Sequence, residues 1–154
     1  MKNQDALEEI GRCIDCKSCM ETCDTYIASG NELQSPNGRL KIAEKVFKDE
    51  EISEEERHGL YTCTLCGTCD VTCTQEIPIS KIIHEAKFRL ADTPLGQYEI
   101  HDTIIQGILE KDNSVNGDPS KRLDWLPEKY LEMEEFGDYD SENLLFLGCM
   151  SSFK

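Results

Sequence analysis

CIDCKSCMETC at residues 13–23 and CTLCGTCDVTC at residues 63–73 are the segments that decide how this chain folds. Each places four cysteines at the spacing C-x2-C-x2-C-x3-C, and together they hold eight of the nine cysteines. A 4Fe-4S cube needs four thiolates at the corners of a tetrahedron, and three cysteines two residues apart on a tight loop can reach three irons of one cube. The repeated spacing therefore predicts two 4Fe-4S clusters.

The fourth cysteine of each segment is predicted to bind the cluster of the other segment, as it does in two-cluster proteins with this spacing. One predicted ligand set then consists of Cys13, Cys16, Cys19 and Cys73, and the other of Cys63, Cys66, Cys69 and Cys23. Because this exchange ties the two segments together, the clusters become part of the fold.

Zinc is the main alternative to iron and sulfide. Structural zinc sites usually use two C-x2-C pairs that are well separated in sequence, whereas each segment here has a third cysteine close to its pair. A zinc-bound interaction module without a redox role stays open as a reading from another functional class. Disulfides would need an oxidising compartment, and residues 1–10 contain no apolar run that could serve as a signal peptide.

The chain is strongly acidic, with 16 Lys and Arg against 31 Asp and Glu and a formal net charge of −15. Nucleic acid is not an expected partner, because phosphate binding depends on Lys and Arg. A negatively charged electron carrier suits docking to basic patches on redox proteins, although the same charge could simply keep the chain in solution. No stretch of about 18 apolar residues predicts a membrane span. The expected location is the cytoplasm, or a membrane surface reached through a partner.

Apolar residues at three- and four-residue intervals predict helices along most of the chain. Ser35 and Pro36 are typical of a helix start, and Ser53 with Glu56 predicts a capping box. The predicted helices cover residues 5–10, 20–28, 39–48, 57–61, 79–92, 96–111 and 128–136. The last apolar run, 144–147, precedes Gly148 and Cys149 and predicts a short buried strand.

Several features of residues 5–95 resemble the helical ferredoxin domain of heterodisulfide reductase iron–sulfur proteins. The resemblance is carried by the two cysteine segments, Ser35-Pro36-Asn37-Gly38-Arg39-Leu40, Ile77-Pro78-Ile79 and Arg89. The relatives of these proteins include iron–sulfur subunits of glycolate, lactate, anaerobic glycerol-phosphate and succinate dehydrogenases. Small βαβ-type ferredoxins are a poorer match, because a proline follows their fourth cysteine, where this chain has Asp24 and Thr74.

Residues 144–150 resemble the opening of the cysteine-rich domain of the heterodisulfide reductase family. In that family the first cysteine follows such a strand, precedes a Cys-Cys-Gly and helps to hold a catalytic iron–sulfur cluster or a related site. Residues 150–154 contain no Cys-Cys-Gly, so Cys149 alone cannot build that site. A structural thiol is the other reading of Cys149. The resemblance implies the N-terminal piece, or a remnant, of a longer reductase.

The expected fold class is all-α: a helical ferredoxin-like domain with two 4Fe-4S clusters at 1–95, a helical and loop extension at 96–142, and the start of a cysteine-rich domain, with its short strand, at 143–154. Ile14, Leu65, Ile77 and Ile79 are candidates for an apolar shell around the clusters. Backbone amides at 17–18 and 67–68 are candidates for hydrogen bonds to sulfur. No nucleophile elbow, phosphate loop or dinucleotide fingerprint predicts catalysis by this chain alone.

The expected function is electron transfer within a heterodisulfide reductase-type complex. The resemblance implies redox subunits as partners: a flavin-containing, hydrogenase, formate dehydrogenase or cytochrome donor, and a cysteine-rich catalytic subunit or domain as acceptor. The alternative within the redox class is the same relay in a flavin-linked dehydrogenase, which carries electrons from flavin toward quinone. Cysteine spacing does not separate these two.

Overall fold

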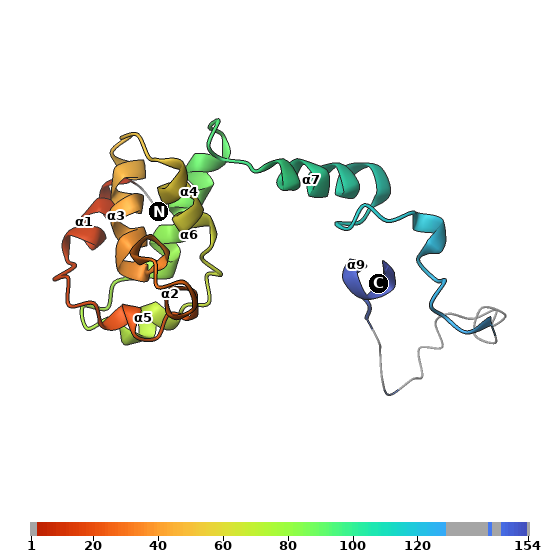
Figure 1. The fold of residues 1–154 in the computed structure, drawn as a ribbon, viewed down its shortest axis with the longest axis horizontal. Helices are drawn as coiled ribbons and strands as arrows, with labels where there is room; N and C mark the ends of the chain where they lie inside the picture. Colours follow the sequence, from red (N-terminus) through yellow and green to blue (C-terminus); the bar gives the residue numbers. More distant parts are fainter. Residues whose placement is uncertain (1–2, 129–141, 143–145, 154) are drawn as a thin grey trace. The chain divides into compact units, whose positions relative to one another are not determined.

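The computed structural model describes residues 3–128, 142 and 146–153, and it divides the chain into two compact units, Met1–Gln97 and Tyr98–Lys154 (Figure 1). The first unit carries all eight cysteines of the two segments. Its helices are α1 (Asn3–Gly11), η1 (Ser18–Met20), α2 (Asp24–Ser29), η2 (Glu32–Gln34), α3 (Pro36–Phe47), α4 (Glu54–Tyr61), α5 (Thr68–Thr72) and α6 (Ile79–Ala91). The predicted helical character is confirmed.

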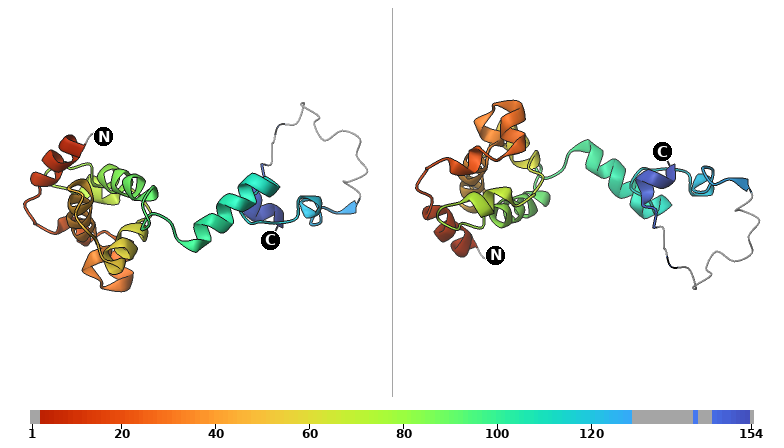
Figure 2. Two further views of the ribbon diagram at one scale, coloured as in Figure 1. Left: turned by 90° about the horizontal axis from the view of Figure 1, so that it is seen from above. Right: turned by 90° about the horizontal axis from the view of Figure 1, so that it is seen from below.

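Helix α3 is the centre of the first unit. Its start is as predicted: Pro36 is the first residue, and the hydroxyl of Ser35 accepts a hydrogen bond of 3.0 Å from the amide of Gly38. The helix contacts α1, α4 and α6 (Figures 1 and 2). The buried residues that α3 and α6 contribute to the core are Leu40, Ile42, Ala43, Val46, Phe47, Ile79, Ile82, Ile83, Ala86 and Leu90.

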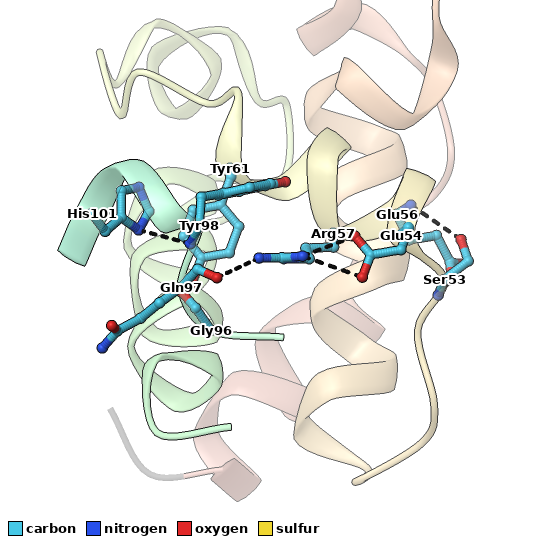
Figure 3. Close-up of polar contacts among 9 residues, drawn as sticks. All are labelled: Ser53, Glu54, Glu56, Arg57, Tyr61, Gly96, Gln97, Tyr98 and His101. Atoms are coloured by element: carbon cyan, nitrogen blue, oxygen red, sulfur yellow. Dashed lines mark hydrogen bonds and ion pairs between the residues drawn. The ribbon is translucent and has the colours of Figure 1, made fainter. Parts of the chain in front are cut away.

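The predicted capping box begins α4. The amide of Ser53 donates to Glu56 Oε2 at 2.8 Å, and the amide of Glu56 donates to Ser53 Oγ at 3.2 Å (Figure 3). Lys45 Nζ lies 2.6 Å from Glu56 Oε1, so the same carboxylate joins α4 to α3. The start of α4 is therefore held both locally and by its neighbour.

The last residues of the first unit are held against α4. Arg57 Nη2 donates to the carbonyl of Gln97 at 2.6 Å, and the hydroxyl of Tyr61 donates to the carbonyl of Gly96 (Figure 3). Arg57 also pairs with Glu54 at 2.9 Å. These contacts bring residues 96–97 back to the helix that precedes the second cysteine segment.

The second unit contains α7 (Glu99–Lys111), η3 (Pro119–Lys121) and α9 (Cys149–Phe153). Helix α7 confirms the helix predicted within residues 96–111. Beyond α7, the buried side chain of Asn113 holds the following turn together. Its Nδ2 donates to the backbone carbonyl of Gly117, and its Oδ1 accepts from the backbone amide of Gly117. In the part of the chain that the structure describes, no helix has the length and apolar character needed to cross a bilayer.

The prediction of a terminal strand is wrong. Residues 146–148 have no regular structure, and Cys149 begins α9 instead of following a strand. A strand must pair its backbone amides and carbonyls with a neighbour, and the residues described here, 3–128, 142 and 146–153, include no strand to pair with. Residues 143–145 and most of the helix predicted at 128–136 lie outside the described residues.

Candidate iron–sulfur sites

The eight cysteines of the two segments line two cavities, four in each. The first cavity is lined by Cys13, Cys16, Cys19 and Cys73, and the second by Cys63, Cys66, Cys69 and Cys23. Three thiols of each cavity therefore come from one segment and the fourth from the other. Cys149 lies in the second unit and lines neither cavity.

The two cysteine loops have the same backbone conformation at equivalent positions. Asp15 and Leu65, which precede the second cysteine of each segment, have φ of 55° and 56°, and Lys17 and Gly67, which follow it, have φ of 62° and 80°. A left-handed conformation costs a residue other than glycine about 1–2 kcal/mol. Three such residues in two short loops are strain of the kind that collects at functional sites.

Cysteines at equivalent positions of the two segments have the same degree of solvent exposure. The second cysteine of each segment, Cys16 or Cys66, is exposed, while the third, Cys19 or Cys69, is buried. Desolvation raises the pKa of Cys19 to about 11 and that of Cys69 to about 12, with further increases from Cys13 and from Asp70 respectively. A bound metal centre would supply the positive charge that deprotonates such thiols outright.

The exposed thiols are stabilised as thiolates. Hydrogen bonds from the backbone and side chain of Ser18 lower the pKa of Cys16, and hydrogen bonds from the side chain and backbone of Thr68 lower the pKa of Cys66. The two donors hold equivalent positions, two residues after the second cysteine of each segment. Of the amides at 17–18 and 67–68 that are predicted to bond to sulfur, those of Ser18 and Thr68 contribute to these lowered pKa values.

Two polar side chains of α3 donate to sulfur, one in each cavity. Asn37 Nδ2 lies 3.9 Å from Cys13 Sγ in the first cavity, and Arg39 Nη1 lies 3.8 Å from Cys23 Sγ in the second. The predicted apolar shell is also in place, since Ile14, Ile77 and Ile79 line the first cavity and Leu65 lines the second. Sequence reasoning gives Asn37 and Arg39 no role of their own; polar residues at the start of an amphipathic helix are the available signal.

These donor sets fit iron–sulfur clusters. Iron–sulfur clusters are bound by cysteine thiolates that surround a cavity, and N–H groups donate hydrogen bonds to their sulfur atoms. Within residues 3–128, 142 and 146–153, no three His, Cys, Asp or Glu side chains are grouped as they would be around a single metal ion. Each set of four cysteines instead surrounds a cavity.

Comparison with known proteins agrees with this chemistry, because the segment from residue 9 to residue 77 matches a family described as a 4Fe-4S dicluster domain. The cofactors of the chain are therefore two 4Fe-4S clusters. The matched segment includes both cysteine segments and all of α3 and α4.

Similarity to curated relatives covers from 40% to 96% of the chain in three examples. One subunit of the dihydromethanophenazine:CoB–CoM heterodisulfide reductase of Methanosarcina barkeri is 25% identical over 163 aligned residues, which cover 96% of this chain and 39% of the relative. The glycolate oxidase iron–sulfur subunit of Escherichia coli is 34% identical over 61 residues, or 40% of this chain and 15% of the relative. One subunit of the fumarate reductase (CoM/CoB) of Methanothermobacter marburgensis is 28% identical over 109 residues, 68% of this chain and 22% of the relative.

The chain thus spans about two fifths or less of the length of these relatives. No solved structure is significantly similar to it. All three relatives are named as subunits of redox enzymes, which agrees with the predicted electron-transfer class.

Proposed function

We propose that this chain transfers single electrons through its two clusters as part of a heterodisulfide reductase-type complex. Cys13, Cys16, Cys19 and Cys73 hold one cluster, and Cys63, Cys66, Cys69 and Cys23 hold the other. The observation that supports this assignment is the division of the eight thiols between two cavities, each with one cysteine from the opposite segment.

The clusters supply one-electron oxidation and reduction, and the residues of this chain control where that chemistry occurs. Buried Cys19 and Cys69 hold the inner side of each site, while exposed Cys16 and Cys66 lie where a partner could approach. Electron transfer requires short distances, so the edges near Cys16 and Cys66 are the expected points of exchange. The partners are redox proteins: a flavin-containing, hydrogenase, formate dehydrogenase or cytochrome donor, and a cysteine-rich catalytic subunit or domain.

The extent of similarity favours the heterodisulfide reductase type over the flavin-linked dehydrogenases. Similarity to the heterodisulfide reductase of Methanosarcina barkeri covers 96% of the chain, whereas similarity to the glycolate oxidase of Escherichia coli covers 40%. The second unit therefore has a counterpart of similar sequence in the first relative. A relay in a glycolate, lactate, glycerol-phosphate or succinate type of dehydrogenase is the second candidate.

Metal analysis of the anaerobically purified full chain tests this proposal. We expect about eight irons and eight sulfides per chain, and a dithionite-reduced electron paramagnetic resonance signal in which two neighbouring clusters interact. About two zinc ions without such a signal would overturn the redox function and would favour an interaction module. About four irons would overturn the assignment of two ligand sets.

A further inference from the structure

The start of α3 aims two different side chains at the two cavities. Asn37 and Arg39 are 5% and 1% exposed, and they are two residues apart, so they leave the helix about 200° from each other. Asn37 donates to Cys13 Sγ and Arg39 to Cys23 Sγ. One cavity therefore receives a neutral amide and the other a cation.

Arg39 is fixed in place by neutral groups. Its Nε donates to the carbonyl of Gly59 at 2.7 Å, and its Nη2 donates to Thr62 Oγ1 at 3.0 Å. The third contact is the thiol of Cys23 at 3.8 Å. Burying a charge is costly unless an opposite charge compensates it. Among the partners that the structure gives Arg39, Cys23 is the group that becomes an anion when it binds a cluster, so the second cavity provides the missing counter-charge.

The buried or half-buried charges near the second cavity are two cations, Arg39 and Lys87, and one carboxylate, Asp70. Lys87 is half-buried and donates to the carbonyl of Cys63 at 2.7 Å. Asp70 opposes these cations, because its carboxylate lies 3.7 Å from Cys69 Sγ, but it accepts hydrogen bonds from the amide and hydroxyl of Ser80. Asp24 also lines this cavity and is exposed to solvent.

Charges near the first cavity are exposed and compensate each other. Asp15 accepts from Asn37 at 2.9 Å and pairs with Lys41 at 3.4 Å, while Lys17 pairs with Glu32 at 3.5 Å. All four of these charged side chains are about half exposed or more, so water and salt screen them. Among the residues that the structure describes, the first cavity therefore has no buried cation comparable to Arg39.

We propose that Arg39 raises the reduction potential at the second cavity above that at the first, so that the first electron to enter the domain resides at the second cavity. This inference rests on the ligand sets of the proposed function. Reduction adds one negative charge, and a nearby cation or an N–H···S hydrogen bond stabilises the more negative state. Arg39 acts through Cys23 and is a positioning residue.

An anaerobic potentiometric titration of the full chain, followed by electron paramagnetic resonance, tests the proposal. The native chain is expected to take up two electrons at two separate potentials. In Arg39→Gln, the reduced-to-oxidised ratio of the higher-potential site should fall at least tenfold at fixed potential, a shift of about 59 mV for one electron. The lower potential should stay unchanged. Arg39→Lys keeps the positive charge, so its higher potential should lie closer to that of the native chain than to that of Arg39→Gln.

Asp70→Asn is the matched variant of opposite sign. Removal of this anion beside Cys69 should raise the higher potential and leave the lower one unchanged. This variant also tests the inference if Arg39→Gln fails to fold. The inference would be overturned by unchanged potentials in variants with full iron content. Equal shifts of both potentials, or a shift of the lower potential alone, would also overturn it. None of these results would contradict the proposed function. Absence of iron from the native chain would overturn both.

Discussion

The ammonium group of Lys87 donates a hydrogen bond of 2.7 Å to the backbone carbonyl of Cys63 and another of 3.4 Å to that of Tyr61. Lys87 belongs to α6, and the two carbonyls lie at the end of α4 and the start of the second cysteine loop. One half-buried side chain thus closes the end of a helix and orients the first cysteine of the loop. Burial lowers the pKa of Lys87, whereas Cys63 opposes that shift.

Replacement of Lys87 by methionine should loosen the second cavity. A hydrogen bond to a charged group contributes about 1.5–3 kcal/mol, and about 1.4 kcal/mol corresponds to a factor of ten. We therefore expect about four of the eight irons to be lost to a chelator about tenfold faster or more. Lys81→Met is the control, because Lys81 lies on the same helix with its side chain exposed. Equal rates in both variants would contradict the role of Lys87.

Cys73→Ser should remove the cluster of the first cavity, although Cys73 belongs to the second segment. The variant is expected to retain about four irons and to melt at a lower temperature, because the fourth ligand joins the two segments. Cys149→Ser is the control, since Cys149 lies in the second unit; it should keep the full iron content. Iron analysis and thermal unfolding measure both effects. A Cys73→Ser variant with its full iron content would contradict the exchange of ligands between segments.

The helices can be predicted because their signals are local. The caps at Ser35 and Ser53 act within three residues, and the apolar stripe of α6 repeats within one turn. The prediction of a terminal strand is wrong for the opposite reason, since a strand depends on a partner that its own sequence does not specify. An apolar run of four residues carries no information about that partner.

The division of the cysteines between two cavities can be predicted from the repeated spacing, whereas the polar side chains of α3 that reach these cavities cannot. Asn37 and Arg39 belong to a helix whose start is predicted, but which cavity each one faces depends on how α3 packs against both loops. The left-handed residues of the loops carry a weak signal as well. Gly67 is the glycine among them, whereas Asp15, Lys17 and Leu65 adopt the same conformation without one.

Glu56→Gln should destabilise the domain at neutral pH and lose its effect in acid. The pKa of Glu56 is lowered first by Lys45 and then by the amide of Ser53. Because its pKa in the folded state is below that in the unfolded state, the ionised carboxylate stabilises the fold above the unfolded pKa of 4.5, and this contribution is lost as the pH falls through the folded pKa. We expect a cost of about 1 kcal/mol at pH 7.

Urea unfolding of the metal-free and the cluster-loaded chains at pH 7 and pH 4 would measure this difference between Glu56→Gln and the native chain. Glu55→Gln is the control, because Glu55 lies one residue earlier with its side chain in solvent. A cost for Glu56→Gln that does not shrink toward pH 4 would mean that the carboxylate charge is not the source of the stabilisation.

Gly38→Ala should disrupt the packing of η2 against α3. A Cβ atom at position 38 would clash with the carbonyl oxygen of Glu32, which is a backbone atom and cannot rotate away as a side chain can. Overpacking of this kind costs about 1–3 kcal/mol or more, and about 1 kcal/mol lowers the melting temperature of a domain this small by about 4–8 °C. Gly11→Ala is the matched control, because its new Cβ would meet no atom within 4 Å other than those of its chain neighbours and its own helix backbone. Thermal unfolding at a fixed scan rate should therefore separate the two variants.

Gly38→Ala should also lower the iron content, because η2 leads directly into the Ser35 cap and the residues that face both cavities. A Gly38→Ala variant with the native melting temperature and full iron content would show that the close approach of η2 to α3 is dispensable.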